Sequence, residues 1–287
     1  MRLSQRLFKL PAKMVALSFM SITLLACKDS VVEPSESIFE SIAGAAQGAH
    51  RSQQNIARNV YRHPEQTLAF FGLAPNMTVI EISPGTLWYT EILAPFLKRD
   101  GRLIAAAYDA TLPNKPPYQA RLTEQMLQRF ESEPFVFSGV ETVAFTPPEV
   151  LALGDDNSAD MVLTFRNTHG WVHDGSAALA FNSFYKVLKP GAVLGVVQHR
   201  GENRLRANSD KMSGYLSEAT VIGLATDAGF ILEDKSEINA NPKDTKDYRK
   251  GVWELLPTLG GSALSKNKHF AIGESDRMTL KFRKPKS

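Results

Sequence analysis

The stretch that decides the fold reads VIEISPGTLWYTEILAPF and spans residues 79–96. Its apolar start predicts a buried strand over 77–82, and the apolar spacing that follows predicts an amphipathic helix over 87–97. The turn at Gly85 between them lets backbone approach a ligand, and the start of the helix offers unpaired N–H groups. This order of elements indicates a ligand site at the carboxyl end of the strand.

Elements of the same two kinds alternate through the rest of the chain. Short apolar runs predict further strands at 102–108, 141–145, 161–165, 192–198, 230–237 and 277–283. Helical spacing predicts helices at 38–54, 64–72, 119–130, 176–188 and 217–229. The alternation predicts an α/β fold with a Rossmann-like, doubly wound, mostly parallel seven-stranded sheet. In such sheets ligands bind at the carboxyl ends of the strands.

The chain divides into segments with different expected roles. A signal peptide over 1–26 and a polar tether over 27–37 precede a single domain over 38–287. The expected parts of this domain are N-terminal helices at 38–72, a Rossmann-like core at 77–238, an insertion at 239–275 and the last strand. The insertion includes Trp253, and its length suggests a lid over a binding site.

The stretch at 79–96 resembles the first motif of the class I S-adenosylmethionine-dependent methyltransferases. In particular, it resembles a family of predicted bacterial methyltransferases whose version of the motif ends in Gly-Trp-Tyr-Thr-Glu, and RNVYRHPEQTLAFFGL (58–73) fits that family's lead-in helix. The segments TFRNTHGW (164–171) and FYKVLKPGAVLGVVQH (184–199) resemble later motifs of that family. The combination of FRN and VLKPG is also similar to the ubiquinone/menaquinone-biosynthesis C-methyltransferases. The resemblance covers roughly residues 57–285.

The resemblance implies S-adenosylmethionine as cofactor and assigns residues to it. Gly85, in the turn with Ser83, faces the methionine portion, and Asp109 holds the ribose hydroxyls, although it could also be a solvated loop residue. We expect Glu81, inside the first strand, to meet the cofactor's ammonium or backbone N–H groups, with a buried ion pair as the alternative. The sequence departs from the family at Leu87, where a branched side chain replaces a glycine that allows close approach to the cofactor.

The loop at 166–174 is expected to face the methyl acceptor. His169 is the candidate general base, although a histidine that caps or packs the loop is the alternative. Arg166 and Asn167 are expected to shape the loop or contact substrate, and Trp171 to line the pocket or belong to the core. No metal site is predicted, because His169 and His173 lie in a loop with no third ligand nearby.

A basic stretch ends the fifth strand and continues into the next loop. His199 is a substrate-binding candidate at the end of this strand. The basic side chains that follow could recognise an anionic acceptor, and a solvated loop is the alternative; they are Arg200, Arg204, Arg206 and Lys211.

The N-terminus predicts export and anchoring in a membrane. MRLSQRLFKLPAK carries four basic and no acidic side chains, and the short apolar stretch that follows ends at Cys27, the only cysteine of the chain. Leu24-Leu25-Ala26-Cys27 resembles a bacterial lipobox, with an ordinary signal peptide as the alternative. We therefore expect a lipid anchor at Cys27 on the periplasmic side of a bacterial membrane.

The charge of the expected mature chain gives no sign of a nucleic-acid partner. Of the 33 basic side chains, 29 remain after the signal, against 30 acidic ones, so the net charge is −1. The sequence thus predicts an S-adenosylmethionine-dependent methyltransferase with a small-molecule acceptor, and the alternative is a non-catalytic lipoprotein that keeps the fold as a binding or scaffold module. The sequence does not indicate the acceptor or the oligomeric state.

Overall fold

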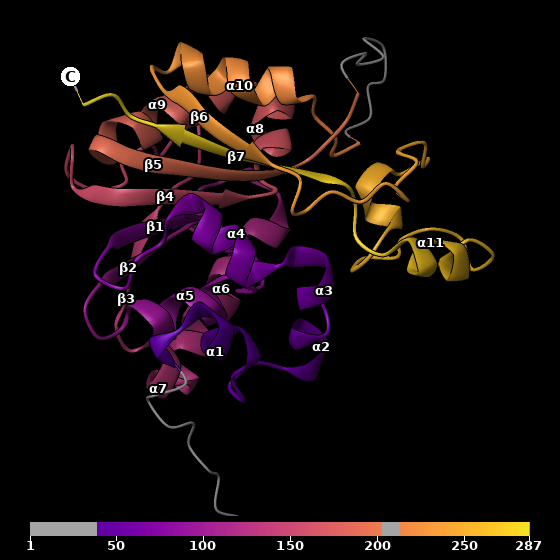
Figure 1. The fold of residues 1–287 in the computed structure, drawn as a ribbon, viewed down its shortest axis with the longest axis horizontal. Coiled ribbons are helices and arrows are strands. Elements are labelled where there is room, and N and C mark those ends of the chain that lie inside the picture. The colour runs from indigo at the N-terminus through magenta and orange to yellow at the C-terminus, as the bar shows by residue number, and fades with distance from the viewer. Residues whose placement is uncertain (1–38, 203–212, 287) are drawn as a thin grey trace, which may run out of the picture. The chain divides into compact units, whose positions relative to one another are not determined.

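The computed structural model describes residues 39–202 and 213–286 (Figure 1). The signal peptide, the tether and Cys27 lie outside the described residues, as do Arg204, Arg206 and Lys211. Within the described part, no helix is both long enough and apolar enough to cross a membrane.

The predicted α/β fold is confirmed. Seven strands form one sheet in the order β3-β2-β1-β4-β5-β7-β6 (Figure 1). Strands β1 to β5 run parallel, and β7 pairs antiparallel with both β5 and β6. Their bounds are β1 Thr78–Ile82, β2 Arg102–Ala107, β3 Val140–Ala144, β4 Ala159–Phe165, β5 Leu188–His199, β6 Ile231–Ser236 and β7 Arg277–Arg283.

The central strand β1 places the candidate site at the topological switch point. From β1 the chain builds outward through β2 and β3 on one side, and then through β4 and β5 on the other. Glu81 lies in register between Ala105 of β2 and Leu163 of β4, so its side chain starts from the middle of the sheet. Because both faces of β1 are covered, the strand is almost continuously apolar, and its one carboxyl group is an exception that calls for a ligand or a partner.

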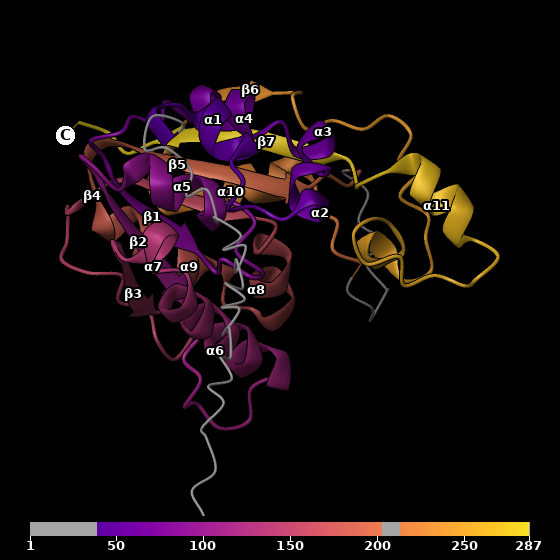
Figure 2. The same cartoon turned by 90° about the horizontal axis from the view of Figure 1, so that it is seen from below.

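Helices cover both faces of the sheet. On one face α9 (Ala177–Val187) and α10 (Glu218–Asp227) pack on Ile80, Val162 and Leu194 (Figure 1). Four helices cover the other face, which includes Val79 (Figure 2). They are α1 (Ile42–Gln47), α4 (Pro64–Phe71), α5 (Thr90–Leu97) and α7 (Pro134–Phe137). Helix α6 (Pro117–Ser132) packs through Met126 against β2.

A glycine in β5 lets α4 approach the sheet closely. A Cβ atom on Gly195 would lie 2.9 Å from the ring of Phe71 and 2.7 Å from the side chain of Leu163. Side chains in a core are packed at crystal-like density, so a larger residue here would push α4 away from the sheet. This contact fixes the helix that precedes β1.

The prediction of one helix over 38–54 was wrong. The chain instead forms α1, then α2 (Gln53–Ile56) and α3 (Asn59–Arg62). Ser41 and Ser52 each cap a new helix through their side-chain oxygens, and α1 ends at Gly48. The interruption brings Arg51 inward, where its side chain bonds the carboxylate of Glu91 at 3.1 Å, so a tertiary ion pair overrides the helical spacing.

The segment expected to be a loop at 166–174 contains a helix, α8 (Thr168–Asp174). Gly175 follows it with φ of +79°, the left-handed conformation that commonly ends helices. The Asn167 and Gly175 that flank this segment are a start-and-stop signal that the apolar pattern alone does not show.

Candidate functional site

An open cavity of about 560 Å³ lies at the carboxyl ends of β1, β2, β4 and β5. Its wall combines the turn after β1 with residues from the ends of the other strands, and it includes most of the predicted site residues: Glu81, Ser83, Gly85, Arg166, Asn167, His169 and His199. A volume of this size is typical of small-molecule sites. The structure therefore brings these residues together at the carboxyl ends of the strands, where the sequence predicted a ligand site.

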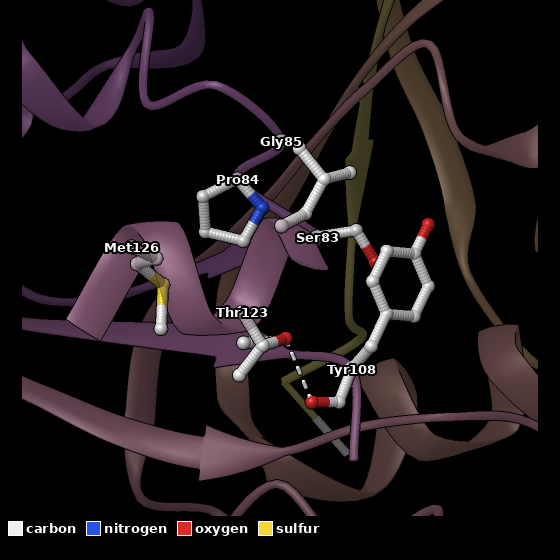
Figure 3. A pocket seen from close by; sticks show the side chains of 8 residues that line it. Ser83, Pro84, Gly85, Tyr108, Thr123 and Met126 are labelled. Atoms are coloured by element: carbon white, nitrogen blue, oxygen red, sulfur yellow. Dashed lines mark hydrogen bonds between the residues drawn. The ribbon is translucent and has the colours of Figure 1, made fainter. Parts of the chain in front are cut away.

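The turn after β1 has an unusual backbone. Ser83, Gly85 and Leu87 have positive φ angles of 46°, 61° and 66°. For Ser83 and Leu87 such angles cost of order 1–3 kcal/mol and are typical of functional sites. On the other side of this turn, Pro84 and Gly85 line a small pocket together with Thr123 of α6, which donates to the carbonyl oxygen of Tyr108 at the end of β2 at 2.9 Å (Figure 3).

Leu87 does not obstruct the cavity. It keeps the left-handed backbone that a glycine would adopt, while its side chain is buried with Ala105, Ala107 and Met126 under α6. It is not part of the cavity wall. The expectation that Leu87 projects toward the cofactor is therefore corrected, because the turn directs this side chain into the core.

The two glutamates of the first motif differ in their partners. Glu91 is buried and contacts the guanidinium groups of Arg51 and Arg129 at 3.1 and 2.5 Å. Glu81 is equally buried, but the only hydrogen bond that its carboxyl group makes in the described structure comes from the hydroxyl of Thr90 at 2.7 Å. Burial raises the pKa of Glu81 to about 8. An ion pair is thus not its partner among the described residues, and its carboxyl group lines the cavity with no cation beside it.

Asp109 lies beside the cavity but not in its wall. Its carboxylate accepts from the backbone N–H and the hydroxyl of Thr111 at 2.9 and 2.6 Å, and these bonds lower its pKa. Its neighbour Tyr108 is the residue that lines the cavity at the end of β2. One carboxylate oxygen of Asp109 is therefore used in a local turn.

Asn167 joins the ends of two central strands. Its side-chain amide donates to the carbonyl oxygen of Ile82 at 2.8 Å and contacts the hydroxyl of Thr164 at 3.2 Å. It therefore shapes the cavity by fixing β4 to β1, which is one of the two roles predicted for it.

Burial disfavours the charged form of both cavity histidines. Burial lowers the pKa of His169 to about 4. Burial, together with His169 and Arg166, lowers the pKa of His199 well below its usual value. The rings lie 5.6 Å apart, and Nδ1 of His199 contacts the hydroxyl of Ser275 at 2.5 Å.

Gln198 determines which nitrogen of His169 carries the proton. Its amide nitrogen donates to the carbonyl oxygen of Gly214 at 2.8 Å, which orients the amide, and lies 3.3 Å from Nδ1 of His169. Nδ1 therefore accepts this bond, and the neutral ring holds its proton on Nε2. In this state the free nitrogen of His169 is a hydrogen-bond donor.

Two further candidates lie away from the cavity wall. Trp171 is buried in the core against Phe145 and Phe184, the second of the two roles predicted for it, because the helical turn of α8 directs it onto α9. Arg200 forms ion pairs with the carboxylates of Asp276, Glu218 and Glu237, so three acidic groups share its charge.

Aromatic side chains that the motif analysis did not assign form much of the wall. The rings of Tyr89 and Phe165 stack with centroids 3.6 Å apart. The ring centroid of Trp253, in the segment at 239–275, lies 5.8 Å from that of His169. The Trp-Tyr pair at 88–89 was visible in the first motif, but its position at the cavity depends on the turn that precedes α5. Within 39–202 and 213–286, no three histidine, cysteine or acidic residues are grouped to hold a metal ion.

Comparison with known proteins supports the fold. No protein-family model and no curated protein matches the chain. Among solved structures, an S-adenosylmethionine-dependent methyltransferase from Aquifex aeolicus is similar at a TM-score of 0.50 and 20% identity, over 64% of this chain and 87% of that one. The [4+2]-cyclase SpnF is similar at a TM-score of 0.51 and 15% identity, over 88% of this chain and 92% of that one.

The two structures are described by different activities, one as a methyltransferase and one as a cyclase. At these identities the likeness concerns the fold, so the reaction has to be argued from the site.

Proposed function

We propose that this chain, which has the fold of class I S-adenosylmethionine-dependent methyltransferases, transfers a methyl group from that cofactor to a small-molecule acceptor. The observation that supports this most is Glu81, a buried carboxyl group without a cation that faces a cavity at the switch point of the sheet. An uncompensated buried acid is costly unless a ligand supplies the missing charge. S-adenosylmethionine carries positive charge on its amino group and its sulfonium.

The residues around Glu81 fit this cofactor. Ideal geometry places the nearest atom to a Cβ on Gly85 at 4.0 Å, so the glycine leaves open space at the cavity wall. The hydroxyl of Ser83 is buried without a hydrogen-bond partner in the described structure and lies at the same turn. We assign Glu81, Ser83 and Gly85 to the methionine portion and Asp109 to the ribose hydroxyls, where its second carboxylate oxygen would act. When bound, the cofactor supplies an electrophilic methyl group.

The acceptor is held at the opposite part of the cavity. His169 donates from Nε2 in the tautomer that Gln198 favours. To act as a general base at Nε2, the neutral ring must instead carry its proton on Nδ1, which requires the Gln198 amide to turn so that its oxygen accepts from Nδ1. Asn167 holds the strand ends in place, and Arg166, His199 and Trp253 surround the acceptor. The chief contribution of the protein to methyl transfer is to align the acceptor and exclude water.

A matched pair of glycine variants tests this assignment. Gly85→Val places a branched side chain at the cavity, and Gly72→Val places the same residue at the end of α4, where φ is +82° and the nearest contact is 3.9 Å. Both carry similar backbone strain. In thermal-shift measurements with S-adenosylhomocysteine, the parent and Gly72→Val should be stabilised and Gly85→Val should not. Equal stabilisation of all three would show that the ligand binds elsewhere.

We also propose that the mature protein is exported and anchored by lipid at Cys27, on the basis of the LLAC sequence and the basic segment before it. Cys27→Ser should prevent acylation and leave the protein unprocessed or in the soluble fraction. Stable anchoring requires more than one acyl chain, so the native modification should carry several. Mass spectrometry that finds an intact, unmodified N-terminus in protein from the native host would contradict this proposal.

A further inference from the structure

Arg166 is a cation in the cavity wall without a bound counter-ion. Its side chain is partly buried and makes no hydrogen bond or ion pair with any residue of 39–202 and 213–286. Its backbone is held at φ of +67°, and its N–H donates to the carbonyl oxygen of Val197 at 2.7 Å. The protein therefore holds a strained residue in place although its charged group has no partner in the described structure.

More guanidinium groups lie behind Arg166 than there are carboxylates to balance them. Arg58, Arg62 and Arg277 all bond to Glu274, at 2.8 to 2.9 Å. The charge of this cluster acts on Arg166: burial, and to a smaller extent repulsion by Arg62, lower the pKa of Arg166 well below its usual value. For Glu274, burial would raise the pKa, but Arg62 and Arg277 outweigh it and lower the pKa. Three arginines thus share one carboxylate, and Arg166 adds a fourth positive charge near them.

Part of the cluster has unused hydrogen-bond donors. Arg62 is 1% exposed, and its Nη1 and Nη2 atoms are buried without an acceptor in the described structure. Its guanidinium lies 4.6 Å from the ring centre of Trp88, a residue of the cavity wall. A buried donor without an acceptor costs about 1–3 kcal/mol. Together with Arg166, these donors produce a positive potential at one side of the cavity.

We propose that the acceptor site takes an anionic small molecule, whose carboxylate or phosphate group is bound by Arg166. This inference deepens the proposed methyltransferase function and rests on it for the identity of the site. Arg166 lies at the end of β4 next to Asn167 and His169, whereas the carboxyl group of Glu81 lies on β1. The cavity therefore has a carboxyl group for the cofactor and a guanidinium group for the acceptor.

The basic stretch that the sequence suggested for an anion is not needed for this role. Arg200 is already paired with three carboxylates, and its pKa is raised by Glu237 and Asp276. Arg166 has no such partners. The anion-binding role thus moves from the end of β5 to the end of β4.

The test uses benzoate and its neutral analogue benzamide as probes. Calorimetric titrations of both would be made with and without S-adenosylhomocysteine, on the parent, Arg166→Gln, Arg166→Lys and Arg102→Gln. Arg102 is an exposed arginine at the start of β2, the end of the sheet opposite the cavity, and serves as the control. We expect the parent to bind benzoate at least tenfold more tightly than benzamide. Arg166→Gln should lose about 10- to 100-fold in benzoate affinity, Arg166→Lys should lose less, and Arg102→Gln should not change.

Two further measurements separate this role from a structural one and from a cofactor contact. Because Arg166 has no ion pair and is repelled by neighbouring arginines, Arg166→Gln should keep or raise the melting temperature. A lower melting temperature with unchanged benzoate affinity would overturn the proposal. S-adenosylhomocysteine carries its own carboxylate and methylthioadenosine does not, so the two ligands together show whether Arg166 binds the cofactor's carboxylate. Because we place Arg166 at the acceptor, Arg166→Gln should leave the affinity for both ligands unchanged. Loss of affinity for S-adenosylhomocysteine alone would assign Arg166 to the cofactor and overturn the proposal.

The outcomes also distinguish failure of this inference from failure of the proposed function. Benzoate binding that depends on Arg166 in a protein that binds no S-adenosylhomocysteine would retain the anion site and refute the methyltransferase. Binding of S-adenosylhomocysteine without a preference for benzoate over benzamide would retain the methyltransferase and refute the anionic acceptor.

Discussion

Replacing Glu81 with glutamine should make the ligand-free protein more stable and its cofactor binding weaker. Glutamine has the same shape, and its carbonyl oxygen can still accept the hydrogen bond from the Thr90 hydroxyl. The two side chains therefore differ mainly in their ability to ionise. The burial that raises the pKa of Glu81 to about 8 from a usual 4.5 is the cause of the predicted effect.

The sign and size of the effect follow from proton linkage. Between pH 4.5 and 8 the folded protein keeps the proton on Glu81, while the unfolded chain has released it, so rising pH favours unfolding. A shift from 4.5 to about 8, at 1.36 kcal/mol for each pH unit, gives roughly 4–5 kcal/mol as an upper bound. Glu81→Gln lacks this proton, so its stability relative to the parent should rise by up to this amount over the same range.

The assay is urea unfolding of the parent and Glu81→Gln at pH 4.5, 6 and 8. Glu124→Gln, which removes an exposed carboxyl group of α6, is the control and should show no such trend. A difference in unfolding free energy between the parent and Glu81→Gln that does not change with pH would show that Glu81 does not keep a proton in the folded protein. It would mean that Glu81 has a partner that stabilises its charge in the free protein.

Two further predictions concern the rest of the site. If His169 is a general base, His169→Asn should lower turnover by about 10²–10⁴-fold at unchanged cofactor affinity. Because burial lowers the pKa of His169 to about 4, the turnover of the parent should fall only as the pH approaches 4. A loss of thermal stability with a proportionate loss of activity would instead indicate a packing role. Leu87→Gly should relieve the strain of a left-handed backbone but lose buried contacts, and urea unfolding should show a net destabilisation of about 1–3 kcal/mol. Its cofactor affinity, measured by calorimetry, should stay within about threefold of the parent. A larger change in affinity would place the Leu87 side chain in the cavity.

The sequence was sufficient for the sheet because its signals are local. Most strands begin with or consist of a short apolar run, and glycine or proline marks most of the turns, so all seven strands could be located before their order was known. The prediction of one helix at 38–54 was wrong because the deciding contact is not local in the sequence. The interruption of this helix depends on Arg51 reaching Glu91, which lies 40 residues further along the chain.

The residues of the candidate site also fall into two groups, those marked by local sequence signals and those that depend on long-range contacts. Glu81, Gly85 and the residues at 166–169 could be found because each follows or ends a strand, and strand ends converge at the switch point. The arginine cluster could not be found, because Arg58 and Arg62 meet Glu274 across more than 200 residues of sequence. The direction of the Leu87 side chain also depended on backbone angles that the residue type does not reveal.

Binding of S-adenosylmethionine coupled to ionisation of Glu81 can be measured by calorimetric titration of the protein at pH 7, in two buffers with different ionisation enthalpies. We predict one bound ligand per chain and release of close to one proton, because Glu81 has a pKa of about 8 in the ligand-free protein, is mostly protonated at pH 7, and must ionise to meet the positive charge. Glu81→Gln should bind more weakly and release no proton from this site. Absence of heat and of thermal shift at millimolar ligand would contradict cofactor binding, and binding by the parent without proton release would contradict the role of Glu81.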